Sequence, residues 1–517
     1  MSQYTRRNVC TLVVMLLLMI VSPMVMAQNE QSSPILEFNS LKELEGKKIG
    51  FITGSIFETV VSEKMPYTGE HLFFSSLADT VAALKAGKVD AACNNLPGCT
   101  LAVSRINGIA ILPEYVSPEV KGFIFPKGST LTAQMDAVLD KFKADGVLDA
   151  LRDKWLNGDN SAKTLPEQVW LGQNGTIRAI ASGIHEPLDY MGDDGVLTGY
   201  DVELALLIAK ELDMKIEFTV APFDAILASV QSKKVDMGLG SITITEERKQ
   251  SVDFSQTIFE SAVVLIVRTS AESSTKTPGM SNIWSNLNSS FKKTFIVENR
   301  WKMILSGFGY TLLISAVAGI LGVLLGFLLV IVRRKEVRGM KIIISCYTAL
   351  MSGLPIVVIL MVLYYIVFGS MNIPGILVAI IGFGLSFGSR SYGIIWNAVQ
   401  AINLGQEEAA LALGYSREQA FRKVILPQAH SIYVPLLQSQ FVSLVKETSV
   451  AGYITVIDLT RAGDLIRSRT MEAFFPLIAI ALIYFILTWS LSMGIKMLQS
   501  SFDLNKRPRK IQGVDAL

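Results

Sequence analysis

The side chains that most often perform chemistry in enzymes are few in this sequence, and they lie far apart. The three histidines are His71, His185 and His430, and no group of residues has the spacing of metal ligands or of a nucleophile with its base. The G-x-x-x-x-G-K-[ST] loop that holds nucleotide phosphates is also missing. The sequence therefore argues against an enzyme, and any ATP-driven step would need a separate subunit.

One charged side chain stands inside an apolar block. Arg390 lies in the second half of the hydrophobic segment Ile376–Trp396. A charge at membrane depth usually faces the interior of a helix bundle and serves a function. The alternative is an arginine whose long side chain reaches the membrane surface. Arg390 is accordingly a candidate functional charge within the membrane.

A polar stretch, EEAALALGYSREQAFRKVILPQA, separates two apolar blocks. Residues 407–412 and 416–423 are good helix formers. Gly414 between them supplies a turn conformation that a side chain would disfavour, and Pro427 is predicted to end the second helix. The stretch is expected to form a helix–turn–helix, or alternatively an amphipathic surface loop.

Hydropathy separates the elements that must position these residues. The 517 residues are half hydrophobic, and the net charge of +2 argues against nucleic-acid binding. Residues 28–300 resemble a soluble protein in composition, whereas later segments reach the ~20 apolar residues that cross a bilayer as a helix. Five spans are predicted: Ile304–Val332, Ile342–Phe368, Ile376–Trp396, Tyr433–Val456 and Phe474–Met497.

Charge fixes the expected orientation of these spans. Arg6 and Arg7, the apolar run 11–21 and the small residues near Ala27 are typical of a secretory signal, with an uncleaved anchor helix as the alternative. Lysine and arginine gather in RRKEVRGMK, in the polar stretch and in NKRPRK, and such short basic loops stay cytoplasmic. Both arguments place the N-terminal half outside the cell and the polar stretch inside.

The polar stretch resembles the EAA loop of ABC importer permeases, with Glu408, Ala409, Gly414 and Pro427 at the family's spacing. The segments LVKETSVAGYITVIDLTRAG and ILSGFGYTLLISAVAGILGVLLG are similar to the polar amino-acid importers in particular. The resemblance covers nearly all of residues 300–502. It implies an all-α transmembrane domain, a loop that docks on a separate cytoplasmic ABC ATPase, and a homodimer of the permease domain.

Short β runs alternate with helical segments over residues 42–156 and again over 176–268, which predicts α/β lobes. Asp201 is expected to cap the helix YDVELALLIAKEL. The segments GVLTGYDVELALLIAKEL and DMGLGSITITEERKQSVDFS resemble the opening lobe of a family 3 polar amino-acid binding protein. LKELEGKKIGFITGS and LKAGKVDAACNNLP resemble its closing lobe. The implied fold is a two-lobed periplasmic binding protein of type II.

The two lobes occur in reversed order. The family runs from the GYDVE part through a hinge strand into the GKKIG part, whereas this chain begins and ends near that hinge. Neighbouring surface termini can be joined by a short linker, so a circular permutation is expected. Two damaged tandem copies are the alternative.

The expected division of the chain is as follows: a signal peptide (1–27), the closing lobe with return helices (28–160), a linker (161–175), the opening lobe (176–270), a second linker (271–297), the permease domain (298–502) with its EAA loop (405–429), and a cytoplasmic tail (503–517).

The binding-protein resemblance also implies a site for an amino-acid carboxylate. The matching arginine is Arg248, and its fork of donors suits a carboxylate. Ser241 and Thr243 lie two residues apart, so both face the same side of an extended segment. The other implied ligand contacts are Ser55 on the closing lobe and the wall residues His185 and Phe223.

One implied contact departs from the family. The aspartate that binds the ligand's ammonium falls on Asn95, which offers no compensating charge. Three explanations stay open: Glu186 supplies the charge, Asp189 supplies it, or the ligand has no free α-amino group.

The expected function is solute capture and translocation by an ATP-driven importer of the bacterial inner membrane, for a polar amino acid or a related small carboxylate. No cofactor is expected. The alternative is a solute-sensing or ligand-gated membrane receptor that uses the same binding fold, although no filter-like sequence of a channel occurs.

Overall fold

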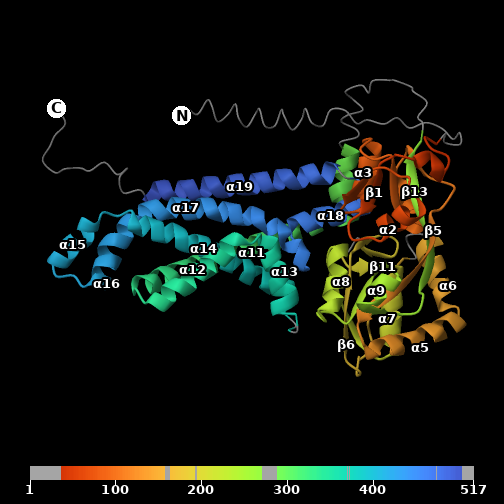
Figure 1. Cartoon of the computed structure of the whole chain (residues 1–517), viewed down its shortest axis with the longest axis horizontal. Coiled ribbons are helices and arrows are strands. Elements are labelled where there is room, and N and C mark those ends of the chain that lie inside the picture. The colour runs from red at the N-terminus through yellow and green to blue at the C-terminus, as the bar shows by residue number, and fades with distance from the viewer. Residues whose placement is uncertain are drawn as a thin grey trace, which may run out of the picture.

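In this computed structural model, the described residues are 36–157, 163–192, 195–269, 288–369, 371, 373–472 and 474–502. The expected signal peptide, most of the second linker and the whole tail lie outside them. A two-lobed α/β domain stands at one end of a long helical region, and α15 and α16 form the opposite end (Figure 1).

The closing lobe is built from the first strands and helices of the chain. Its elements are β1 (Ile49–Ile52), α2 (Phe57–Lys64), β2 (His71–Phe74), α3 (Leu77–Lys85), β3 (Ala91–Asn95), α4 (Leu96–Arg105) and β4 (Ile109–Ile111). β1 pairs in parallel with both β2 and β3. Asn95 ends β3 and also caps α4, so this one residue links the strand to the helix.

The opening lobe follows the same plan. Its strands and helices are β6 (Thr176–Ala181), α7 (Tyr200–Glu211), β10 (Lys215–Val220), α8 (Phe223–Gln231), β11 (Met237–Thr243), α9 (Glu246–Lys249) and β12 (Val252–Phe254), with a small sheet of β7 (Ile184–His185), β8 (Asp189–Met191) and β9 (Leu197–Thr198). The alternation predicted from the sequence is therefore present in both lobes.

The prediction that Asp201 caps α7 is wrong. Gly199 precedes α7, and its φ of +131° suits glycine. Asp201 lies in the first turn instead, where it is buried and its carboxylate accepts a hydrogen bond from the Gly240 N–H at 3.3 Å. A side chain at Gly199 would collide with the backbone of Leu188, so this position requires glycine.

Two long strands connect the lobes. β5 (Ser117–Pro126) and β13 (Phe259–Arg268) pair antiparallel with each other. β5 continues into the opening lobe against β11 and β12, and β13 continues into the closing lobe against β3 and β4. Both lobes thus share one sheet, in the order β10-β6-β11-β5-β13-β3-β1-β2.

Two helices that follow β5 return to the opening lobe. α5 (Thr130–Ala144) and α6 (Val147–Arg152) share a hydrophobic core with α7. Trp155, just beyond α6, is fully buried and donates from its indole nitrogen to Glu203 at 2.6 Å. α5 and α6, the segment expected to hold the return helices, therefore pack on the opening lobe.

The helical region contains the remaining elements. They are α11 (Trp301–Arg334), α12 (Arg338–Gly353), α13 (Ile356–Met361), α14 (Gly375–Gln400), α15 (Leu404–Ala412), α16 (Arg417–Ala420), α17 (Leu426–Glu447), α18 (Leu459–Thr470) and α19 (Phe474–Phe502). α11 and α14 pack closely because small residues meet: a Cβ on Gly326 would lie 2.7 Å from that of Ser391.

Within the described residues, three helices are long and apolar enough to cross a membrane: Trp301–Arg334, Gly375–Gln400 and Phe475–Ile495. The bent pair Arg338–Gly353 and Ile356–Val367, with an angle of 111°, can serve as a fourth span. α17, which covers most of the expected fourth span Tyr433–Val456, does not meet the same criterion, and it ends at Lys446 and Glu447, the two charges inside that expected span. The number five stays a prediction.

Candidate functional site

The two lobes close around a small cavity of about 20 Å³. Its lining comprises Ile52, Ser55, Ile56, Phe57, Asn94, Asn95, His185, Phe223, Gly240, Thr243 and Arg248. Six of the seven residues expected at the ligand site are in that list. The seventh, Ser241, lies in β11, but its side chain is outside the described residues. A cavity of this size holds about one water molecule, so the cleft is closed.

Arg248 reaches across the closed cleft. It lies in α9, which Thr245 caps by accepting from the Arg248 N–H at 3.2 Å. Its guanidinium donates to the Thr243 carbonyl oxygen at 3.3 Å and to the Gly54 carbonyl oxygen of the closing lobe at 3.2 Å. Burial lowers the pKa of Arg248. These acceptors are neutral carbonyl oxygens, so an anionic group of a ligand would stabilise the guanidinium charge further.

A buried ion pair beneath Thr243 was not expected from the sequence. The Thr243 hydroxyl donates to Glu119 of β5, and the same carboxylate oxygen contacts Lys121 Nζ at 2.8 Å. Glu119 and Lys121 have side chains that are 0% and 1% exposed. The available signal was the charged pair in EVKG within an otherwise apolar strand.

The two residues expected to form the wall of the ligand site are in contact. The rings of His185 and Phe223 are 5.2 Å apart and nearly perpendicular, which is a favourable arrangement for aromatic rings. His185 Nδ1 lies 2.9 Å from the Ser182 hydroxyl. Ser55 donates its own hydroxyl to the Ile52 carbonyl oxygen at 2.6 Å.

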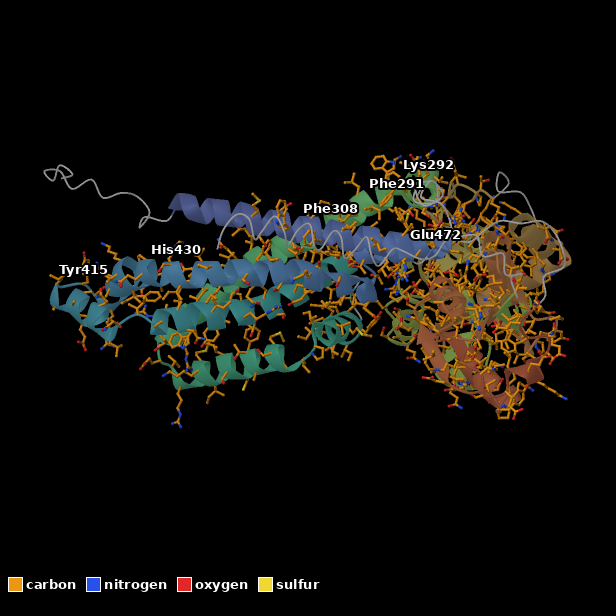
Figure 2. All side chains as sticks on the ribbon, turned by 90° about the horizontal axis from the view of Figure 1, so that it is seen from above. Phe291, Lys292, Phe308, Tyr415, His430 and Glu472 are labelled. Carbon is orange, nitrogen blue, oxygen red and sulfur yellow. The ribbon has the colours of Figure 1, made fainter. Side chains whose placement is uncertain are left out.

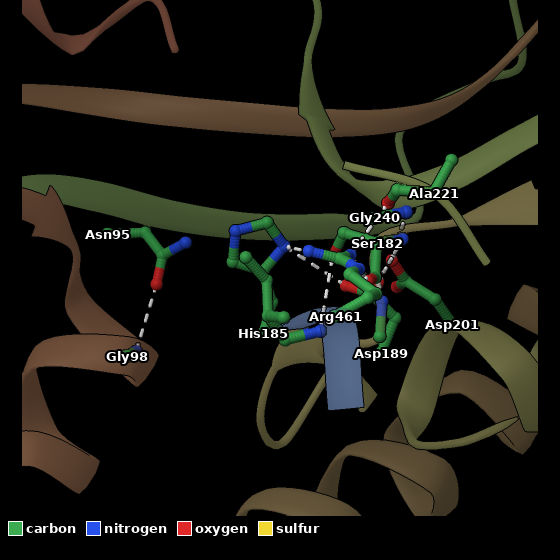
Figure 3. A network of polar contacts seen from close by, with 11 residues as sticks. Asn95, Gly98, Ser182, His185, Asp189, Asp201, Ala221, Gly240 and Arg461 are labelled. Atoms are coloured by element: carbon green, nitrogen blue, oxygen red, sulfur yellow. Dashed lines mark hydrogen bonds and ion pairs between the residues drawn. The ribbon is translucent and has the colours of Figure 1, made fainter. Parts of the chain in front are cut away.

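Asn95 presents its amide nitrogen to the cleft. Its Oδ1 accepts from the Gly98 N–H at 2.9 Å, because Asn95 caps α4. The amide nitrogen consequently points toward His185 (Figure 3). In this state the side chain offers donors rather than an acceptor to a bound molecule.

The two acidic residues that could replace the family's aspartate are already engaged. Asp189 is fully buried and accepts from the N–H groups of Ser182 and Gly183 at 2.9 and 3.0 Å. Both oxygens of Glu186 accept from Arg105 at 2.7 Å. Burial tends to raise the pKa of Glu186, but the hydrogen bond from Arg105 and the charges of Arg469 and Arg105 lower it overall.

Arg390 pairs with an acidic residue of another helix. Its Nη1 donates to Glu447 of α17 at 2.5 Å, and its Nη2 lies 3.2 Å from the Ser386 hydroxyl. The side chains of Arg390 and Glu447 are 27% and 30% exposed. Arg390 of α14 is thus paired with α17, and its role as a functional charge stays a prediction.

The expected coupling loop lies at the far end of the helical region, where Figure 2 labels Tyr415. Gly414 joins α15 to the next helix with a φ of +86°. Glu408 and Ala409 are exposed on α15. Pro427 does not end a helix, since it stands in the first turn of α17, where its missing N–H is not needed.

Comparison with known proteins identifies the class of protein to which this chain belongs. Residues 177–447 match the sequence profile of the bacterial extracellular solute-binding proteins, family 3. The match begins within β6, the first strand of the opening lobe.

Among curated relatives, the L-cystine transport system permease protein TcyB of Bacillus subtilis is 28% identical over 214 residues, or 40% of this chain and 90% of that protein. The putative glutamine transport system permease protein GlnP of Rickettsia felis is 30% identical over 207 residues, or 39% and 94%. A crystal structure described as an amino acid ABC transporter with histidines is 30% identical and covers 42% of this chain and 98% of its own, with a TM-score of 0.38.

The chain belongs to the family 3 solute-binding proteins, and it carries in addition a permease region homologous to amino-acid ABC permeases. It is a transport protein rather than an enzyme, because its relatives are permeases and solute-binding proteins.

Proposed function

We propose that this protein captures a polar amino acid or a related small carboxylate outside the cell and passes it through its own helices. A separate cytoplasmic ABC ATPase would drive the transfer. The observation that carries the proposal is the joining of a two-lobed cleft, across which Arg248 reaches, to permease helices in one chain.

The arrangement of the chain supports an orientation. The cleft domain and the α15–α16 loop lie at opposite ends of the helical region (Figure 1). The loop exposes apolar side chains that a partner would cover, including Leu404 (77% exposed) and Leu413 (80%). We therefore infer that the loop faces the cytoplasm and docks on the ATPase through Glu408, Ala409 and Gly414, in a homodimer within the bacterial inner membrane.

The solute is inferred from the cleft. Arg248 would bind a carboxylate, with Thr243, Ser241 and Ser55 adding donors and His185 and Phe223 forming the wall. Asn95 supplies an amide where a charge is expected, and Glu186 and Asp189 are both committed to other partners. Arg390 with Glu447 would offer a second pair of opposite charges to a zwitterion within the membrane.

We also infer that the binding domain is circularly permuted and spans residues 28–270, with 161–175 as the joining linker. Leu36 forms an antiparallel bridge with Thr269, so the start of the domain lies beside its end. Residues 28–275, produced alone, should unfold in one cooperative transition whose midpoint rises with bound solute. Separate transitions for 28–160 and 170–275 would favour two damaged copies instead.

The partner is tested by isolating the full chain from native membranes in mild detergent. An ATPase with a phosphate-binding loop should co-purify, and the Gly414→Asp variant should lose it. Recovery of no such ATPase above the level of the variant would contradict the proposed function.

A further inference from the structure

α18 connects the helical bundle to both lobes of the binding domain. It lies between α17 and the two lobes (Figure 1). Leu465 belongs to the hydrophobic core of the opening lobe, and Met471, just after the helix, packs into a core of the closing lobe. A helix of the permease region therefore forms part of two cores of the binding domain.

Two arginines of α18 hold one lobe each. Arg461 donates from Nη2 to the carbonyl oxygens of Ser182 at 2.7 Å and Ala221 at 3.0 Å, which follow β6 and β10 of the opening lobe (Figure 3). Arg467 forms an ion pair with Asp79 in α3 of the closing lobe. In the closed domain, α18 thus reaches acceptors on both lobes at once.

A third arginine, Arg469, contacts a carboxylate that the two lobes already share. Glu186 of the opening lobe accepts two hydrogen bonds from Arg105 of the closing lobe, each 2.7 Å long. Arg469 forms an ion pair with the same carboxylate. Arg105 also donates to the backbone carbonyl of Arg469 at 2.9 Å. The Glu186 side chain is only 6% exposed, so these partners replace water around its charge.

We propose that Glu186 is a positioning residue through which closure of the cleft and docking on α18 favour each other. Closure brings Arg105 to Glu186 and to the backbone of Arg469. Opening would withdraw both Arg105 and Asp79, and α18 would keep only its contacts with the opening lobe. The permease would accordingly hold the closed domain more tightly than the open one. The meaning of this link for transport rests on the proposed function, but the link itself does not.

Hydrogen exchange of the full chain in lipid nanodiscs tests the link without transport. Glu186→Gln removes the charge and keeps the shape. It should speed the exchange of amides in both α4 (96–105) and α18 (459–470) by about tenfold, because hydrogen bonds to a charged group are the strong ones. Lys48→Ala, which removes an exposed ion pair with Glu70 inside the closing lobe, is the matched control and should change neither segment.

Faster exchange in only one of the two segments, or in neither, would overturn the proposal. Exchange in α5 reports whether the opening lobe remains folded. If Glu186→Gln speeds exchange there as well, Arg105→Ala decides the question. That change lies in the closing lobe, and the proposal still requires faster exchange in α18. Unchanged exchange in α18 would then refute it.

Discussion

Arg248→Ala should abolish most solute binding without unfolding the domain. The guanidinium donates across the closed cleft to Gly54 and along its own lobe to Thr243. Removing one partner of a buried charged pair costs ~3–5 kcal/mol. Because Arg248 is only partly buried, we take the lower value. At 1.4 kcal/mol for each factor of ten, affinity should fall by roughly a hundredfold.

Titration calorimetry on the full chain in detergent measures this loss, with standard amino acids and their deaminated analogues as probes. Lys249→Ala is the matched control, since Lys249 is adjacent and pairs only with the exposed Glu246 in the described structure. Arg248→Lys keeps the charge but loses the fork, so it should bind with intermediate affinity. Affinity in Arg248→Ala equal to the wild type, with unchanged thermal stability, would refute the carboxylate role of Arg248.

Three further predictions follow from named contacts. Asn95→Asp keeps the cap on α4 and adds a negative charge to the cleft, so calorimetry should show tighter binding of α-amino acids. Weaker binding of α-amino acids, together with a preference for deaminated acids, would exclude a ligand with an amine. Gly414→Asp, at a φ of +86°, and Glu408→Lys should stop uptake of radiolabelled solute and leave binding unchanged. The control Gly393→Ala, with open space around it, should leave both uptake and binding unchanged. Asp458 caps α18 by accepting from the Thr460 and Arg461 N–H groups, and burial raises its pKa to about 6, above the unfolded value of ~3.9. The stability contributed by its protonated form is therefore full below ~3.9 and is lost as the pH rises through about 6. The thermal midpoint should therefore fall more between pH 5 and 7 in the wild type than in Asp458→Asn, and equal slopes would contradict the shift.

Local sequence patterns predicted the secondary structure of both lobes well, because burial in an α/β layer imposes a period on each segment. The residues of the cleft came from the resemblance to the family 3 binding proteins and not from a local pattern: Arg248, Thr243, His185 and Phe223 line one cavity. Their roles as ligand contacts remain predictions. The errors were local as well. Asp201 lies inside α7 rather than before it. Pro427, which was predicted to end a helix, lies in the first turn of α17 instead.

What no local pattern could show is the set of contacts between distant segments. Arg461 binds Ser182 and Ala221 from a segment more than 200 residues away, and nothing in the sequence around α18 indicates that it packs against the binding domain. The burial of the Glu119–Lys121 pair could not be predicted locally either, because it depends on how β5 pairs with β11 and β13. Such contacts form only when distant segments of the chain pack together in the folded protein.

The most direct test is uptake into proteoliposomes that contain the full chain and the ATPase isolated with it. Radiolabelled solute, chosen from the calorimetry panel, is supplied outside and ATP inside. We expect accumulation that requires ATP hydrolysis and is lost in Arg248→Ala and in Gly414→Asp. Solute binding without any ATP-dependent accumulation, or a solute-gated ion current in the absence of ATP, would contradict an importer and favour a receptor.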